Sequence, residues 1–317
     1  MSLFAVSALR KTYPDLKITV ATKKKFARFY QEIPDIGILT LDAEGSLKSL
    51  LEIAGKAVHS GVNLVADIHN SLRGKILRLY LGLHGARTAS FRKCRRERAA
   101  IKGKGRTAVP LRHNVLRFCD VFAALGYPVP EPSQTRMHRP VPEVFGVKSG
   151  RWIGYAPFAS RQMKIYPDRQ SRELVRLMTE EFDRVFIFSG PGREQEFARE
   201  MERLYGNVTG VFGRTDIWGE LALMSELDAI VTMDSSSMHL ASLAGTPLVS
   251  VWGATHPAAG FMGYGYDIER NCIQLDLDCR PCSIFGEGKC RYGDYRCLTG
   301  ITPDAIMRKV RQVCSSE

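Results

Sequence analysis

The 317-residue sequence has no long run of apolar residues and little cysteine. No segment approaches the roughly 18 apolar residues that a membrane-spanning helix needs. Residues Met1–Leu9 are apolar but lack the basic start and small-residue cleavage site of a signal peptide. Eight cysteines are too few for a disulfide scaffold in a chain of this length. We therefore expect a cytoplasmic protein with reduced thiols.

Three further absences exclude classes of protein. No G-x-G-x-x-G turn follows a strand-like segment, which excludes an NAD-type oxidoreductase. No repeat of solenoid period and no low-complexity tract is present. Hydrophobic residues make up 44% of the chain and charged residues 25%, as in ordinary globular domains, and 317 residues are enough for two of them.

The net charge of +12 is concentrated in one segment. Between Arg87 and Arg106 nine Lys or Arg stand against the single acid Glu97, a local charge of +8 that leaves +4 for the rest. The segment could be a solvated loop, or it could bind an anionic acceptor, an anionic membrane surface or nucleic acid. No interleaved aromatics or RNA-binding signature accompany it, so we expect no nucleic-acid partner.

Strand-like and helix-like segments alternate along most of the chain, which predicts parallel sheets with helices on both faces. The predicted strands are 17–21, 37–41, 62–66, 86–91, 152–156, 184–188, 207–211, 229–232 and 247–251. The predicted helices are 4–12, 24–30, 47–58, 72–81, 114–125, 170–181, 195–204, 218–225 and 237–244.

A proline-rich segment separates the two halves. Residues 127–142 contain five prolines, which prevent regular hydrogen-bonded structure. We therefore predict two α/β domains, residues 1–140 and 141–317, of Rossmann-like doubly wound topology. Two such domains place a ligand cleft at the carboxyl ends of their strands.

The segment from Val231 to Gly253 carries the clearest motif. A strand ends at Asp234, and three serines then lead into a helix that ends near Gly245. Unpaired N–H groups and about half a positive charge at a helix N-terminus form an anion site, here suited to a diphosphate. Alternatively, these residues only cap the helix, and His239 only packs within it.

Cysteines cluster near the C-terminus. The spacing Cys279-x₂-Cys282-x₇-Cys290-x₆-Cys297 is compatible with a four-thiolate structural zinc site, although the second pair is wide. The alternative is a reduced, packed set of thiols.

Several motifs together resemble those of glycosyltransferase family 9, the lipopolysaccharide heptosyltransferases. They are Asp234-Ser-Ser-Ser-Met-His239, Trp252-Gly-Ala-Thr-His-Pro257, Ala156-Pro-Phe-Ala-Ser160-Arg-Gln-Met-Lys164, Phe188-Ser-Gly-Pro-Gly-Arg-Glu194 and Cys279-Arg-Pro-Cys282. In the first half the resemblance is weaker and rests on residues 8–14 and 65–69.

The resemblance implies the GT-B fold and an inverting transfer that uses no metal or other cofactor. The donor would be a nucleotide sugar, ADP-heptose, and the acceptor a phosphorylated lipopolysaccharide core at the anionic inner face of the inner membrane. Residues 1–140 would be the acceptor-side domain, and residues 141–317 would bind the donor and end in the Cys-rich tail. Donor-binding residues would be Ser160, Lys164, Glu194, Asp234, Ser235, Ser236, Ser237 and His239, and acceptor-side residues His69, Arg73, Arg92, Arg95 and Arg96.

One departure concerns the start of the chain. Family members begin with a strand and a glycine-containing loop that carries the general base, and this sequence opens on the helix that follows them. We therefore expect a truncated chain. Asp67 and His69 are the candidates to replace the missing base. The alternatives are a non-catalytic nucleotide-sugar-binding protein and a family relative that uses another nucleotide sugar.

Overall fold

The computed structural model describes residues 1–41, 46–103, 109–134 and 139–315, and it divides into two compact units. Unit 1 comprises Met1–Cys94 and Arg112–Ser133, and unit 2 comprises Arg95–Leu111 and Gln134–Glu317. The chain therefore crosses between the units three times, whereas the sequence predicted a single boundary at residue 140. The segment after Cys94 leaves unit 1 because it packs against unit 2, as described below.

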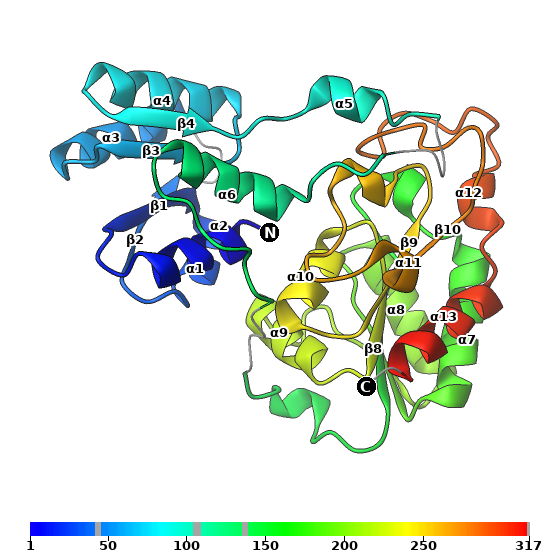
Figure 1. Ribbon diagram of the computed structural model, residues 1–317. Helices are drawn as coiled ribbons and strands as arrows, with labels where there is room; N and C mark the ends of the chain where they lie inside the picture. The colour runs from blue at the N-terminus through cyan, green and yellow to red at the C-terminus, as the bar shows by residue number, and fades with distance from the viewer. Residues whose placement is uncertain (42–45, 104–108, 135–138, 316–317) are drawn as a thin grey trace. The chain divides into compact units, whose positions relative to one another are not determined.

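Unit 1 alternates strands and helices as predicted (Figure 1). Its elements are α1 (Ser2–Thr12), β1 (Ile18–Lys23), α2 (Lys24–Tyr30), β2 (Ile36–Leu41), α3 (Leu47–His59), β3 (Leu64–Asp67), α4 (Leu72–Leu83), β4 (Arg87–Ser90) and α6 (Asn114–Ala124). The strands form two parallel pairs, β1 with β2 and β3 with β4, and no ladder between the pairs is seen in the described part of the chain. Ser46 and Ser71 accept hydrogen bonds from the first-turn amides of Ser49 and Gly74 and so begin α3 and α4.

Unit 2 is built around a six-stranded parallel sheet in the order β10-β9-β8-β5-β6-β7. The strands are β5 (Trp152–Ala156), β6 (Arg184–Ile187), β7 (Val208–Gly210), β8 (Ala229–Met233), β9 (Leu248–Trp252) and β10 (Cys272–Gln274). The helices are α5 (Arg95–Ala99), α7 (Asp168–Glu181), α8 (Arg193–Leu204), α9 (Ile217–Ser225), α10 (Ser236–Ala244), α11 (Ile268–Asn271), α12 (Arg296–Thr299) and α13 (Pro303–Cys314). Short 3₁₀ turns are η2 (Glu143–Phe145), η3 (Gln162–Lys164) and η4 (Pro257–Ala259).

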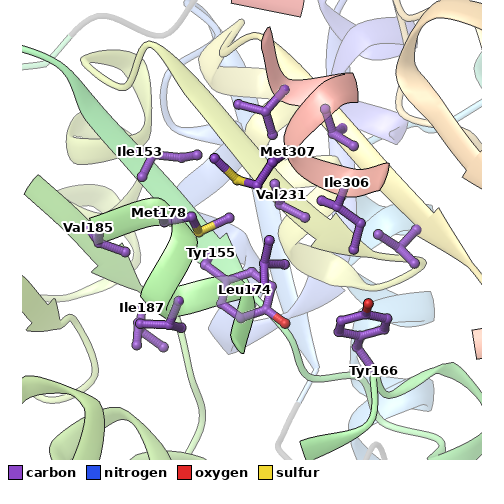
Figure 2. Packing of buried hydrophobic residues seen from close by; sticks show 14 of the residues in the cluster. Ile153, Tyr155, Tyr166, Leu174, Met178, Val185, Ile187, Val231, Ile306 and Met307 are labelled. Atoms are coloured by element: carbon purple, nitrogen blue, oxygen red, sulfur yellow. The ribbon is translucent and has the colours of Figure 1, made fainter. Parts of the chain in front are cut away.

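The core of unit 2 explains why its strands are apolar at nearly every position. All residues of β5, β8 and β9 are buried, as expected of parallel strands covered on both faces. On one face Ile153, Tyr155 and Val231 pack against Leu174 and Met178 of α7, and α8 and α13 join the same cluster (Figure 2). α10 packs against β8 and β9, and α9 packs on α10 (Figure 1). This doubly wound sheet confirms the predicted α/β class.

Candidate active site

The carboxyl edge of the unit 2 sheet brings together loops that are distant in sequence. β5 and β8 are neighbours, and their register pairs Ala156 with Thr232. Asp234 therefore lies two residues beyond the paired end of β8, opposite the loop that follows β5 and leads to Lys164. The strand order alone makes these two loops adjacent, because parallel strands end at the same edge.

Lys164 and Asp234 form an ion pair at this edge. The Lys164 Nζ donates to Asp234 Oδ2 over 3.2 Å, and the side chains are only 13% and 10% exposed. Burial raises the pKa of Asp234 above its ordinary value, and the ammonium of Lys164 opposes that rise. This nearly buried ammonium donates to one carboxylate oxygen among the described residues, and it therefore retains donors for a further anionic ligand.

The N-terminus of α10 lies beside this pair, since Ser235 follows Asp234 directly. Ser235 is the N-cap residue, with extended backbone, but its side chain caps no amide of α10. Its Oγ is buried and has no hydrogen-bond partner in the described part of the structure. Ser236 is exposed and Ser237 partly buried at the start of the helix. The uncapped first turn of α10 and the buried Oγ of Ser235 thus directly follow the aspartate that pairs with Lys164, an arrangement that suits an anion.

The remaining predicted donor residues lie in unit 2 as well. Ser160 is exposed in the loop after β5, and His239 lies partly buried one turn into α10. Glu194 is in the first turn of α8, where its Oε2 accepts a 2.7 Å hydrogen bond from the amide of Gly190. This bond fixes the turn after β6, and Gly192 permits it by adopting φ +69°. In the described part of the chain, Glu194 thus accepts this bond with Oε2, and its Oε1 can accept from a ligand.

The C-terminal tail supports Lys164 from a second direction. Gly286 has φ +79°, and a Cβ at this position would lie 2.7 Å from Lys164 Cγ. Only a residue without a side chain allows the tail to approach the lysine stem this closely. Glu287 next to it faces Arg161 at 4.0 Å. The tail is thus part of the site, which the sequence motifs did not reveal.

Arg280 is a second contribution that sequence reasoning missed. Its buried guanidinium donates to four acceptors, two of them in the loop after β9: the carbonyls of Gly253 and Thr255, each at 2.8 Å. The others are the carbonyl of Leu275 and the side chain of Gln274. Burial lowers the pKa of Arg280. Arg280 thereby connects the tail to the loop after β9, the strand next to β8. In the sequence, Arg280 was marked only by its place in Cys279-Arg-Pro-Cys282.

His256 lies in the same loop. Its Nδ1 accepts a hydrogen bond from the amide of Ala258 over 3.1 Å and begins η4. Burial, followed by the charge of Arg280, lowers the pKa of His256 to about 4. The imidazole is therefore neutral at physiological pH, with its proton on Nε2.

The cysteine cluster does not form the zinc site that its spacing allowed. Cys279, Cys282, Cys290 and Cys297 line one pocket, but within the described ranges no three His, Cys, Asp or Glu side chains are placed to hold a metal ion. The thiols have separate surroundings: Cys282 faces the carbonyl of Ala254, Cys290 faces Asp294, and Cys297 is buried in the core. All eight cysteines are free thiols.

In unit 1, the candidate base Asp67 is engaged in a turn. Its Oδ1 accepts from the amides of His69 at 3.1 Å and Asn70 at 2.6 Å, and its Oδ2 accepts from Arg78 Nε at 3.2 Å. The side chain is 7% exposed. His69 itself is exposed, as is Arg73 on α4. These contacts connect the end of β3 to α4.

The basic segment is divided between the two units. Arg92 is exposed in unit 1, whereas Arg95 and Arg96, predicted for the acceptor-side domain, lie exposed on α5 in unit 2. The reason is apolar and cation–π packing: the Arg98 guanidinium lies 4.5 Å from the ring centroid of Phe261, and Ile101 packs with Ala258 and Ile284. Lys104 and Arg106 lie outside the described residues.

Comparison with known proteins identifies the family. The sequence matches glycosyltransferase family 9 (heptosyltransferase) over residues 56–288, more than half of the chain. This chain belongs to glycosyltransferase family 9. As a member of that family it is a glycosyltransferase, as the motifs predicted.

Several individual proteins and solved structures are similar to this chain. The lipopolysaccharide core heptosyltransferase OpsX of Haemophilus influenzae is 22% identical over 264 residues, covering 81% of this chain and 76% of that protein. A glycosyltransferase family 9 structure from Veillonella parvula has a TM-score of 0.72 at 18% identity and covers 100% of this chain and 96% of its own. The E. coli heptosyltransferase WaaC with ADP has a TM-score of 0.67 at 17% identity, with coverages of 98% and 95%. These similarities confirm the predicted GT-B fold.

No helix in the described ranges combines the length and the apolarity needed to cross a bilayer.

Proposed function

We propose that this family 9 glycosyltransferase transfers a heptose from ADP-heptose to a lipopolysaccharide core acceptor, with inversion at the anomeric carbon and without a metal ion. The observation that carries the proposal is the placement of Lys164, paired with Asp234, at the uncapped N-terminus of α10. This is a compact set of fixed positive groups at the carboxyl edge of a parallel sheet.

The proposed ligand of these groups is the diphosphate of the donor. The amides of Ser235, Ser236 and Ser237 would donate hydrogen bonds to phosphate oxygens. The buried Oγ of Ser235, which has no partner in the described part of the structure, would supply one more donor. Lys164 would donate to a phosphate oxygen, either in place of Asp234 or in addition to it. The carboxylate of Asp234 could then accept a hydrogen bond from a sugar hydroxyl. Ser160 and His239 would support the two loops, and the second oxygen of Glu194 would accept from the nucleotide ribose.

The same groups would assist the reaction. In an inverting transfer the acceptor oxygen forms a bond to the anomeric carbon as the bond from that carbon to the diphosphate oxygen breaks. Negative charge then develops on the leaving ADP, where Lys164 and the helix amides are already positioned to stabilise it. The acceptor hydroxyl loses its proton to a base. The sequence names Asp67 as a candidate, but its carboxylate already accepts three hydrogen bonds in a turn, so we do not assign it this role.

The choice of ADP-heptose and of the acceptor is supported by the relatives. OpsX is described as a lipopolysaccharide core heptosyltransferase, and WaaC was solved with ADP. Phosphorylated core would bring negative charge, and five residues of this chain are proposed to receive it: His69, Arg73, Arg92, Arg95 and Arg96.

The deciding experiment is calorimetric titration with ADP, UDP, GDP and NAD. We expect ADP to bind best, and Lys164→Ala to weaken it about 10–100-fold through loss of a charge-assisted hydrogen bond. Lys148→Ala is the matched control, because Lys148 forms another lysine–aspartate pair, with Asp228 at 3.1 Å, away from this edge. Preference for UDP or GDP would exclude heptose carried by ADP, and unchanged affinity of Lys164→Ala would remove the diphosphate site.

Transfer is tested separately with ADP-heptose and a heptose-free core acceptor. Formation of a heptosylated product supports the enzymatic proposal. Tight ADP binding without any product would favour the alternative of a non-catalytic nucleotide-sugar-binding protein.

A further inference from the structure

A half-exposed aromatic side chain lies in the tail beside Lys164. Phe285 is 50% exposed, although both of its neighbours in the sequence are fixed in place. Ile284 is buried in a small apolar cluster, and Gly286 packs against the Lys164 stem. Single exposed apolar side chains are common on protein surfaces, so a role for this one depends on where the ring lies and how firmly it is held.

The turn that carries Phe285 is closed by hydrogen bonds. The amide of Glu287 donates to the Oγ of Ser283 over 2.9 Å. The amide of Ser283 in turn donates to the carbonyl of Ala254, in the loop after β9, over 3.2 Å. Phe285 is the middle residue of this turn, so its backbone is anchored on both sides while half of its side chain stays exposed.

The ring of Phe285 is also held in place by neighbouring side chains. It contacts the ring of Phe261, with 5.6 Å between the centroids and 59° between the planes. The guanidinium of Arg98 lies 4.5 Å from the Phe261 centroid and 5.9 Å from the Phe285 centroid. Arg98 is itself buried, and a buried cation beside two aromatic rings holds them through cation–π attraction. A ring that is ordered before a ligand arrives loses little conformational entropy on binding.

Phe285 lies close to the proposed diphosphate site. A Cβ on Gly286 would lie 2.7 Å from Lys164 Cγ. Consecutive Cα atoms are about 3.8 Å apart, so the Phe285 Cα lies within roughly 8 Å of that carbon. Phe261, which contacts the ring, follows η4 in the loop after β9 and so comes from the carboxyl edge of the sheet. A sugar ring bonded to a diphosphate at Lys164 would lie at a comparable distance.

We infer that Phe285 is a stacking residue for a sugar ring held next to the diphosphate. A pyranose carries its hydroxyls at the rim and exposes C–H groups on its faces, and such groups pack favourably against the negative face of an aromatic ring. Lys164 and Asp234 would supply the polar contacts, and Phe285 the apolar contact beyond them. The inference rests on the proposed function and deepens it, because it assigns a residue that distinguishes a nucleotide sugar from the bare nucleotide.

Two sugars share this chemistry, the one bonded to the diphosphate and the one that accepts the transferred group. Closeness to Lys164 favours the sugar of the donor. Calorimetric titrations with ADP and with ADP-heptose compare the unmodified chain with Phe285→Ala. We expect the affinity for ADP to be unchanged and the affinity for ADP-heptose to fall about 5–10-fold, the size of one lost aromatic contact. If the ring stacks on the acceptor sugar instead, both affinities stay unchanged, and the acceptor KM in the transfer assay rises by the same factor.

Two further variants separate stacking from simple burial of apolar surface. Phe285→Trp keeps an aromatic face and should retain the effect of the unmodified chain. Phe285→Leu is apolar but has no such face, so it should behave as Phe285→Ala does.

The matched control is Tyr292→Ala. Tyr292 is also an aromatic residue of the tail with 50% exposure, but its ring lies 4.1 Å from the Arg296 guanidinium and outside the turn that carries Phe285. This variant should bind ADP and ADP-heptose as the unmodified chain does, with an unchanged acceptor KM.

Two results would overturn the inference alone. An equal loss of affinity for ADP and ADP-heptose in Phe285→Ala would show that the ring only supports the turn over Lys164. Unchanged ADP-heptose affinity together with an unchanged acceptor KM would show that no sugar contacts the ring. Failure of the proposed function would appear in the unmodified chain itself, as absent binding of ADP, and it would overturn the inference as well.

Discussion

Lys164 and Asp234 lie 70 residues apart in the sequence, yet they form a nearly buried ion pair with 3.2 Å between Nζ and Oδ2. The pair exists because β5 and β8 are adjacent parallel strands whose following loops meet at one edge. It joins the predicted phosphate-binding lysine to the residue that begins the serine turn of α10.

The first prediction separates stability from binding at the ion pair. Lys164→Ala leaves Asp234 buried without its cation, which should lower the free energy of unfolding by roughly 2–3 kcal/mol. The double variant Lys164→Ala/Asp234→Asn should recover most of that loss but none of the ADP affinity. Urea denaturation and calorimetry measure the two effects. ADP affinity that returns in the double variant would show that Lys164 acts only through the fold.

The second prediction concerns Gly286, which packs over the Lys164 stem. Gly286→Ala should weaken ADP binding about tenfold, because its Cβ would displace the lysine from the α10 N-terminus. Gly288→Ala is the control: Gly288 also has positive φ, +92°, but nothing lies within 4 Å of an added Cβ. Both variants carry the backbone strain, and only the first should affect the nucleotide. Equal ADP affinity in the two variants would contradict a positioning role for the tail.

The third prediction is a pH dependence of stability due to His256. The pKa of its imidazole is about 4 in the folded chain, below the ordinary value of 6.5. Between these values the unfolded chain takes up a proton that the folded chain does not, so stability is lost as pH falls from about 6.5 to about 4. Thermal unfolding across this range should show a smaller slope for His256→Asn, whose amide oxygen can still accept from Ala258. An unchanged slope would assign the pH dependence to other groups.

The fourth prediction distinguishes two roles of Asp67. Asp67→Asn retains an oxygen for the turn but loses the charge that pairs with Arg78. Because three donors already occupy the carboxylate, we expect a loss of about 1 kcal/mol in stability and a change in kcat of less than about tenfold. Steady-state transfer rates at several pH values are the measurement. A fall in kcat of roughly 10²–10⁴ with unchanged KM would instead establish Asp67 as the general base.

Most of the regular structure could be predicted from the sequence. Every predicted strand and helix has a counterpart, and β5 and α2 coincide with the predicted segments. The reason is that apolar periodicity, caps and breakers act locally and need no knowledge of the partners. β10 and α13 were missed because β10 has three residues and the tail was interpreted through its cysteines.

The candidate donor site was also visible in the sequence, but only as separate loops. Asp234 and the three serines follow a buried strand, and Lys164 follows another, so both could be assigned to the carboxyl edge of a sheet. Which loops are neighbours depends on strand order, and strand order is set by packing among elements far apart in sequence. Only the tertiary structure could therefore join Lys164 to Asp234 and bring Gly286 against the lysine stem.

The basic segment and the cysteine cluster show the same division. Composition determined that the chain carries a local charge of +8 between Arg87 and Arg106. Tertiary packing of Arg98 and Ile101 decided that its latter part belongs to unit 2. Spacing allowed four thiolates to share a zinc ion, but the folded tail surrounds each thiol differently. Sequence determines charge, periodicity and chemistry along the chain, whereas the choice of neighbours is made by long-range burial, because contacts between distant residues form only when the whole unit packs.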